Sequence, residues 1–299
     1  MEKQLKQLVI VLMLLIISLS SFSQNEPILK IGLVADPQYS DMPTAGIRYY
    51  RESLWKLNEA VDTFNYHNVD FVQNFGDIID TVWSSFDSII PIYQKLNPGI
   101  ENYHLLGNHD FHIDSTQFTG LLKTLSMPDY YYSYVKKAWR FIVLDATDYS
   151  FYTIGLHNHS DEKVNALFEK TEGKPNHYRW NGGIGEEQKN WLKQEIDSAK
   201  LLSQKVIIFS HMPVRPINNA HNLWNDAEIV DIIEKYSNVK VFINGHNHSG
   251  DYIFKNGIHY ITLTGMVNTS INSFGILEIY TDAIFLKGFG RQENMFMKY

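Results

Sequence analysis

The sequence predicts an α/β (α+β) protein in which stacked β-sheets are flanked by helices. Short apolar runs typical of buried strands alternate with amphipathic segments as far as residue 243, which is the pattern of βαβ units. From residue 252 onward the apolar segments all have the length of strands. Neither an internal repeat nor linker-like composition interrupts this order, so we expect one domain over residues 24–299, preceded by a leader.

In the first half of the chain, strand-like and helix-like segments alternate. Leu29–Ala35 is short and apolar and is followed by Asp-Pro, as expected of a buried strand that ends in a loop. Arg48–His67 carries Leu57 and Val61 on one face, which is the periodicity of an amphipathic helix. The other elements expected here are strands at Val69–Phe75, Tyr103–Leu106, Tyr130–Val135 and Arg140–Leu144, and helices at Phe86–Leu96 (with a break or kink at Pro91) and Ser115–Leu125.

The second half begins with a segment that reads as loop, residues 146–184, because it is rich in Gly, Asn and His. Glu186–Leu202 has acidic residues in its first turn, which favours a helix start there. Asn256-Gly257 is a hairpin turn signal. The remaining expected elements are a helix at Asp226–Tyr236 and strands at Val206–Phe209, Val241–Ile243, Tyr252–Phe254, Ile258–Leu263, Phe274–Tyr280 and Ala283–Phe289.

Residues 1–23 have the layout of a secretory signal peptide. Lys3 and Lys6 give a basic start, Leu8–Ile17 is an unbroken apolar run, and small residues precede Gln24. The run is shorter than the about 20 residues that a spanning helix needs. Cleavage is therefore favoured over a retained membrane anchor or a buried first helix.

Removal of this leader would leave an exported protein, periplasmic or extracellular, with no stable membrane span, since no later run approaches spanning length. The glycosylation sequon Asn247-His248-Ser249 lies inside the strongest metal motif, where a glycan would block access. This placement favours export from a bacterium.

The composition excludes several classes of protein. The 33 acidic residues outnumber the 26 Lys and Arg, giving a net charge of −7, which disfavours a general nucleic-acid-coating role. The chain has no cysteine, so disulfides, iron–sulfur clusters and thiolate zinc sites are absent. A metal site must then use His, Asp, Glu, Asn or Gln, and 12 histidines are available.

Ligand-type residues follow five of the predicted strands directly. Each alone would be weak, since a lone Asp after a strand is usually a cap or turn residue. In open α/β folds, however, sites lie at the carboxyl ends of strands, so five such ends can converge. The residues are Asp36 and Gln38; Asp77; Asn108, His109 and Asp110; His211; and His246 and His248.

These motifs together resemble the calcineurin-like metallophosphoesterase superfamily. The resemblance covers about residues 29–290 and rests on Asp36-x-Gln38, Gly76-Asp77, Gly107-Asn108-His109-Asp110, His211 and Gly245-His246-x-His248. It implies a four-layer αββα sandwich of two mixed β-sheets flanked by helices, with a two-metal site at the strand ends.

One departure narrows the resemblance. Most of the superfamily has His two residues after the first Asp, where this chain has Gln38. Gln at this place, with the segment Arg48–Leu54, is similar to the manganese-dependent ADP-ribose/CDP-alcohol diphosphatases, although the loop between Gln38 and Arg48 is shorter than in the animal members. The stretches 286–291 and Leu223-Trp224-Asn225 also resemble that branch.

The resemblance assigns roles to individual residues. Asp77 would bridge two metals, His109 would face the phosphate, and Arg48 and Trp224 are candidate substrate contacts. Asp110 either orients His109 or caps a turn. The implied ligands are Asp36, Gln38, Asp77 and His248 for one metal, and Asp77, Asn108, His211 and His246 for the other.

The ligand types also bear on the cofactor. The amide oxygen of Gln38 in place of an imidazole makes the first site harder, which favours Mn²⁺; Mg²⁺, Fe and Zn²⁺ are the alternatives. Two divalent ions about 3.5–4 Å apart can clamp a phosphate and lower the pKa of a shared water.

We therefore expect an exported two-metal phosphohydrolase that cleaves the phosphoanhydride of nucleoside diphosphate derivatives, such as ADP-ribose and CDP-alcohols, by attack of a metal-bound hydroxide. Its partner would be a small phosphorylated molecule of nucleotide type, and no feature of the chain points to a protein partner. A phosphomonoesterase or phosphodiesterase of the same superfamily is one alternative. A non-catalytic surface binding protein with a vestigial metal site is the other.

Overall fold

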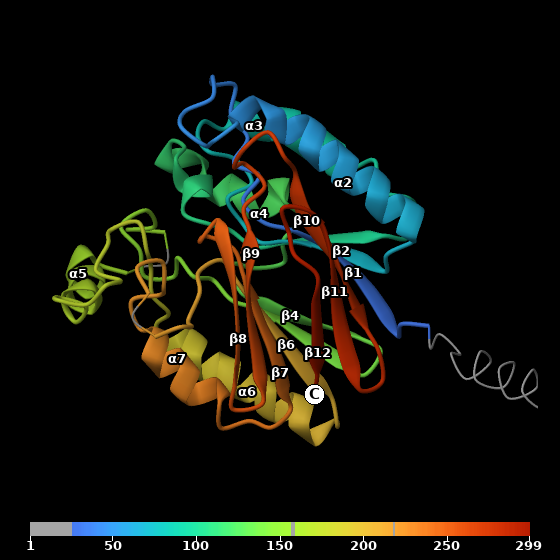
Figure 1. Ribbon diagram of the computed structural model, residues 1–299. Coiled ribbons are helices and arrows are strands. Elements are labelled where there is room, and N and C mark those ends of the chain that lie inside the picture. Colours follow the sequence, from blue (N-terminus) through green and yellow to red (C-terminus); the bar gives the residue numbers. More distant parts are fainter. Residues whose placement is uncertain (1–25, 157–158, 218) are drawn as a thin grey trace, which may run out of the picture.

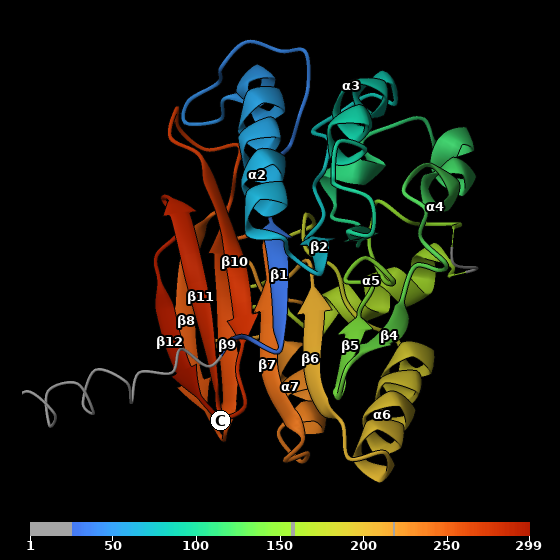
Figure 2. The same ribbon diagram turned by 90° about the vertical axis from the view of Figure 1, so that its right-hand side faces the viewer.

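A computed structural model describes residues 26–156, 159–217 and 219–299, and the predicted leader at 1–23 lies outside them. Two six-stranded sheets pack face to face, and helices cover their outer faces (Figures 1 and 2). This is the four-layer αββα sandwich of two mixed sheets that the sequence predicted. Within the described residues, the helices are too short or too polar to cross a membrane.

The first sheet has the order β12-β11-β10-β1-β2-β3. Its parallel part joins β1, β2 and β3, while β10 runs antiparallel to β1. Helices α2 (Ser53–His67) and α3 (Ser84–Tyr93) cover its outer face. The strands are β1 (Leu29–Val34), β2 (Phe71–Asn74), β3 (Glu101–His104), β10 (Ser273–Ile279), β11 (Ala283–Gly290) and β12 (Met295–Lys298).

The second sheet has the order β4-β5-β6-β7-β9-β8, with β5, β6, β7 and β9 parallel. Helices α6 (Glu186–Leu201) and α7 (Asp226–Ile233) cover it from outside. The strands are β4 (Tyr132–Lys136), β5 (Trp139–Val143), β6 (Lys205–Ser210), β7 (Val239–Asn244), β8 (Ser249–Lys255) and β9 (Ile258–Thr264).

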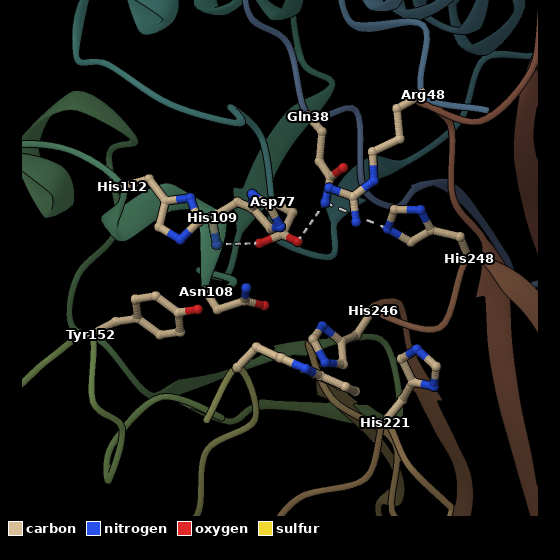
Figure 3. Close-up of a pocket in the computed structure, with 11 residues that line it drawn as sticks. Gln38, Arg48, Asp77, Asn108, His109, His112, Tyr152, His221, His246 and His248 are labelled. Atoms are coloured by element: carbon tan, nitrogen blue, oxygen red, sulfur yellow. Dashed lines mark hydrogen bonds between the residues drawn. The ribbon is translucent and has the colours of Figure 1, made fainter. Parts of the chain in front are cut away.

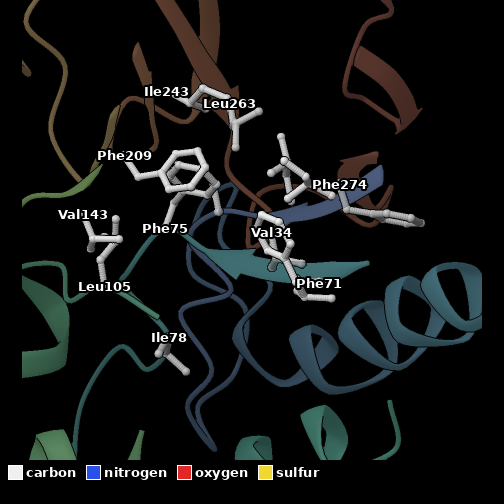
Figure 4. Packing of buried hydrophobic residues seen from close by; sticks show 14 of the residues in the cluster. Val34, Phe71, Phe75, Ile78, Leu105, Val143, Phe209, Ile243, Leu263 and Phe274 are labelled. Atoms are coloured by element: carbon white, nitrogen blue, oxygen red, sulfur yellow. The ribbon is translucent and has the colours of Figure 1, made fainter. Parts of the chain in front are cut away.

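Aromatic side chains fill the space between the sheets (Figure 4). Phe71 of the first sheet meets Phe141 of the second edge-to-face, with ring centroids 5.1 Å apart. Phe75 and Phe209 repeat this contact at 5.2 Å. Because Phe75 and Phe209 lie at the carboxyl ends of β2 and β6, this packing brings the same ends of both sheets together.

Several predicted boundaries were wrong. The helix expected from Arg48 begins with a 3₁₀ turn at Tyr50–Glu52 that leads into α2 at Ser53, because Arg48 itself pairs through its backbone with Ala45 and Asn268. The expected loop 146–184 contains helix α5 (Asp161–Glu169), whose apolar stripe is minimal, since only Val164 is buried. The other differences are a 3₁₀ helix at Ser115–Gly120 leading into the short α4 (Leu121–Thr124), a start of β8 at Ser249, and strand β12, which was not predicted.

A buried neutral histidine at the end of β3 is expected to make the protein less stable as the pH falls. His104 is 4% exposed, and burial lowers its pKa to about 3. The unfolded chain binds a proton there below about pH 6.5, whereas the native chain stays neutral, so acid favours unfolding by up to about 1.4 kcal/mol per pH unit. Urea unfolding should therefore show the free energy of unfolding falling more steeply from pH 6.5 to 4.5 in the wild type than in His104→Gln. Parallel curves would contradict this, since all other groups are shared.

Candidate metal centre

The carboxyl ends of β1, β2, β3, β6 and β7 meet at one edge of the sandwich, and the predicted metal ligands and His109 lie there. Figure 3 shows six of these residues: Gln38, Asp77, Asn108, His109, His246 and His248. The backbone of four of them is left-handed, which L-residues adopt at a cost that is often found at functional sites. The φ values are 51° at Asp36, 44° at Gln38, 50° at Asp77 and 65° at His246.

Two glycines allow the loops to approach this closely. A Cβ atom at Gly107 would lie 2.2 Å from Asp77 Oδ1 and 2.6 Å from the ring of His211. A Cβ atom at Gly245 would lie 2.6 Å from Asp36 Oδ2. Any side chain at either position would therefore push ligand-type residues apart.

The acidic and imidazole groups form two clusters that could each hold a cation. One cluster is Asp77, His211 and His246, and the other is Asp36, Asp77 and His248. Within each cluster the ligand atoms lie within 4.8 Å of one another. Asp77 is common to both, so its two carboxylate oxygens could serve two ions at once.

Hydrogen bonds fix which ring nitrogens carry protons. His211 Nδ1 lies 2.7 Å from the carbonyl oxygen of Phe75, which can only accept, so Nδ1 donates and Nε2 is the nitrogen that faces the ligand cluster. That Nε2 is 3.1 Å from Nδ1 of His246 and 3.4 Å from Asp77 Oδ2. Two neutral nitrogens facing each other at this distance repel unless a proton or a metal cation lies between them.

The charges in this cluster are strongly coupled. Burial acts to raise the pKa of Asp77, but positive charge on His211 and His109 outweighs it and holds that pKa well below its usual range. Burial acts to lower the pKa of His211, but the Asp77 carboxylate raises it to about 9. Without metal, a proton on His211 therefore supplies the positive charge that a cation would bring.

Two buried amide oxygens complete the donor set. Gln38 Oε1 and Asn108 Oδ1 are both buried and have no hydrogen-bond partner among the described residues. A buried unpaired oxygen is costly, and a cation would satisfy it. The residues present therefore fit hard divalent cations, held by carboxylate and amide oxygens together with imidazole nitrogens.

His109 is held by a carboxylate that the sequence reasoning missed. Its Nδ1 lies 3.0 Å from Asp80 Oδ1, and its backbone N–H donates to Asp77 Oδ1 at 2.8 Å. Burial acts to lower the pKa of His109, but Asp77 and Asp80 together raise it. Asp80 also lies 3.7 Å from the guanidinium of Arg48. In the sequence, the feature that could have indicated Asp80 is its position three residues after Asp77, in the loop that follows the same strand.

Asp110 holds together the loops that follow β2 and β3, and its carboxylate is not directed at the ring of His109. Its carboxylate accepts from the backbone N–H groups of Gly107 at 2.9 Å and Ile78 at 2.8 Å. It therefore ties the loop after β3 to the loop after β2. Of the two roles considered for Asp110, the geometry favours the structural one.

A cavity of about 340 Å³ opens beside the ligand cluster. Arg48, a predicted substrate contact, lines it. Trp224 does not: it is 2% exposed, packs against Phe151 and Phe168, and donates from its indole nitrogen to a backbone carbonyl. Its placement at a substrate contact is thus wrong, because the ring anchors α5 and the preceding loop. The lining residues that were not predicted are His112, Tyr152, Trp180 and His221.

Comparison with known proteins places the chain in a family. The model of the family described as calcineurin-like phosphoesterase matches residues 29–250. The chain belongs to the calcineurin-like phosphoesterase family. As a calcineurin-like phosphoesterase, it is a metal-dependent hydrolase of phosphoric esters or anhydrides, as the motifs predicted.

Individual relatives agree with the predicted branch. A protein of Oryza sativa named manganese-dependent ADP-ribose/CDP-alcohol diphosphatase is 32% identical, over 89% of this chain and 92% of its own length. A protein of Arabidopsis thaliana with the same name is 31% identical, over 90% and 97%. The crystal structure of a dimetal phosphatase from Danio rerio superposes with a TM-score of 0.83 and 26% identity, covering 92% of this phosphoesterase and all of that chain.

Proposed function

We propose that this phosphoesterase hydrolyses nucleoside diphosphate derivatives, such as ADP-ribose and CDP-alcohols, with Mn²⁺ as its preferred cofactor. The products would be a nucleoside monophosphate and a phosphorylated partner. The observation that carries the proposal is the sharing of Asp77 by two ligand clusters beside a cavity that Arg48 lines. The names of the plant relatives support the substrate class.

The ligands of the two ions would be those predicted from the sequence. When bound, divalent ions would neutralise charge on the phosphoryl oxygens and lower the pKa of water. His109 lines the cavity with its Nδ1 held by the Asp80 carboxylate, so in the protonated ring Nε2–H would donate to a phosphoryl or leaving oxygen. Arg48 offers a positive charge to the second phosphate.

A substrate panel tests this proposal. Protein loaded with Mn²⁺ would be offered ADP-ribose, CDP-choline, a cyclic nucleotide and a simple aryl phosphate, and kcat/KM would be compared. Preference for ADP-ribose or CDP-choline supports it. Preference for the aryl phosphate or the cyclic nucleotide would favour a phosphomonoesterase or phosphodiesterase. No turnover with any divalent metal would favour a binding protein.

Gln38 is expected to set the metal preference. Gln38→His replaces a hard amide oxygen by imidazole, so the ratio of kcat/KM with Mn²⁺ to that with Zn²⁺ should fall by about tenfold, or about 1.4 kcal/mol of discrimination. Gln38→Glu keeps an oxygen donor and should retain the preference for Mn²⁺. An unchanged ratio in Gln38→His would remove the argument from ligand hardness.

We also propose that residues 1–23 direct export and are removed, leaving residues 24–299 as the mature domain in the periplasm or outside the cell. The basic start and the apolar run Leu8–Ile17 support this. Mass spectrometry of protein expressed from the complete sequence should find a mature chain that begins at Gln24 in the exported fraction. An intact chain beginning at Met1 in the cytoplasm would contradict it.

A further inference from the structure

Two buried asparagines lie behind the histidines of the His246-Asn247-His248 motif, one behind each ring. Asn181 comes from the loop between α5 and α6, and Asn268 from the loop after β9. They are 0% and 7% exposed. Each places its side-chain oxygen about 3 Å from a ring nitrogen, at 3.0 Å for Asn181 and 3.1 Å for Asn268. Neither residue belongs to the ligand set predicted from the sequence.

The orientation of the Asn181 amide is fixed by its other contacts. Its NH₂ group donates to the backbone carbonyls of Asn176 at 3.1 Å and Ala220 at 2.8 Å, which can only accept. Its oxygen must then face His246 Nε2, which therefore carries the proton. His246 Nδ1 is left with its lone pair directed at the cluster, 3.1 Å from His211 Nε2.

The same reasoning gives the opposite tautomer at His248. Without a cation, the NH₂ group of Gln38 donates to Asp77 Oδ2 at 2.9 Å and faces His248 Nε2, at 3.5 Å, as a donor. With a cation bound, the amide would turn to present Oε1, and the cation would face the same His248 nitrogen in place of the NH₂ group. His248 Nε2 is then the unprotonated nitrogen, 3.6 Å from Asp36 Oδ1. Nδ1 carries the proton and donates to Asn268.

The loop that carries Asn268 is itself held in place. The buried ammonium of Lys56, on α2, donates to the carbonyl oxygens of Met266 at 3.0 Å and Thr269 at 2.6 Å, on either side of Asn268. The backbone of Asn268 also pairs with that of Arg48. His248 is thus oriented from the side of the first sheet, whereas His246 is oriented by loops that cover the second.

We propose that Asn181 and Asn268 are positioning residues, each of which fixes the tautomer and ring orientation of one histidine so that it can bind a different cation. Asn181 supports the cation of the Asp77 and His211 cluster through His246. Asn268 supports the cation of the Asp36 cluster through His248. This inference rests on the two-cation centre of the proposed function. Loss of such an outer hydrogen bond costs about 10- to 100-fold in metal affinity.

The test is a Mn²⁺ titration of the full domain by calorimetry and electron paramagnetic resonance. The wild type should bind two Mn²⁺ with a spin-coupled signal. Asn181→Leu and Asn268→Leu should each weaken one site by about 10- to 100-fold, so that an uncoupled six-line signal of single Mn²⁺ dominates at intermediate concentration. Asn268→Asp keeps the acceptor and should restore coupling.

Asn222→Leu is the matched control, because Asn222 is an equally buried loop amide that donates to Pro216 and Asp226 and does not touch the histidines. Its titration should match the wild type. If both Leu variants of the positioning residues fold and titrate as this control does, the inference is overturned. Wild-type protein that binds fewer than two Mn²⁺ overturns it together with the proposed centre. If the wild type binds two coupled ions but does not hydrolyse ADP-ribose, only the proposed substrate is contradicted, and the positioning roles stand.

A measurement on the unsubstituted protein covers variants that fail to fold. In ¹⁵N-histidine-labelled, metal-free protein, long-range ¹H–¹⁵N spectra distinguish the two neutral tautomers. We expect the proton on Nε2 of His246 and on Nδ1 of His248. The opposite tautomer at either ring would overturn the role assigned to its asparagine.

Discussion

Asp77→Asn is expected to abolish hydrolysis of ADP-ribose, with kcat/KM falling by about 10³-fold or more. The amide would lose several kcal/mol of charge stabilisation, and each 1.36 kcal/mol lost lowers the rate about tenfold. Asp77 is the residue shared by both ligand clusters of the described chain. An amide there removes the negative charge that would hold the cations, and it cannot accept from both His109 and Gln38 as the carboxylate does. Steady-state kinetics and bound Mn²⁺ per chain measure the two losses.

Asp148→Asn is the control for this change. Asp148 is also a buried carboxylate, accepting from Gly185 and Gln188, but it belongs to neither ligand cluster. It should lose stability without losing bound metal. A thermal melt of Asp77→Asn should show a folded protein. Activity within tenfold of the wild type in folded Asp77→Asn would refute the assignment of the shared ligand.

The five strand ends could be predicted because two regularities apply to them. Apolar runs locate buried strands, and parallel strands present their carboxyl ends on one edge of the sheet. Asp36, Asp77, Asn108, His211 and His246 lie one to four residues after the ends of such strands, so the local pattern was enough to place them near one another. Gln38, together with the segment Arg48–Leu54 and the stretches 286–291 and Leu223-Trp224-Asn225, then indicated the branch of the family.

The residues that orient these ligands could not be predicted in the same way. Asn181 reaches His246 from a loop 65 residues away in the chain, and nothing in the pattern around an asparagine in a loop shows which carbonyls its amide will meet. Trp224 illustrates the reverse error. Its neighbourhood resembles the family, but packing against the α5 region decided that its ring is a core group.

Helix α5 was missed for a related reason. A helix is recognised from its apolar stripe, and Val164 is the single buried residue of this one. What holds the region is long-range contact, including the stack of Phe168 on His177 and the packing of Phe151 on Trp224. These contacts join residues far apart in the chain, so the local sequence of the segment gives no sign of them.

The second large effect is expected at His109. His109→Ala should lower kcat/KM for ADP-ribose by about 10²- to 10⁴-fold, the usual range for a positioned proton donor. Because His109 is not among the proposed ligands, Mn²⁺ binding should remain close to that of the wild type. This combination separates it from Asp77→Asn, where both properties are lost. A parallel loss of Mn²⁺ in His109→Ala would instead make it part of the metal centre.

Asp80 tests how His109 is held. If Asp80 acts by orienting the ring through the 3.0 Å contact at Nδ1, Asp80→Asn should impair turnover in the wild type but have little further effect once His109 is alanine. Residues that act as a unit show this non-additivity. Asp80 also lies 3.7 Å from Arg48, so a remaining effect of Asp80→Asn in the double variant should appear in KM rather than in kcat. Fully multiplicative losses in kcat would show that the carboxylate acts independently of the histidine.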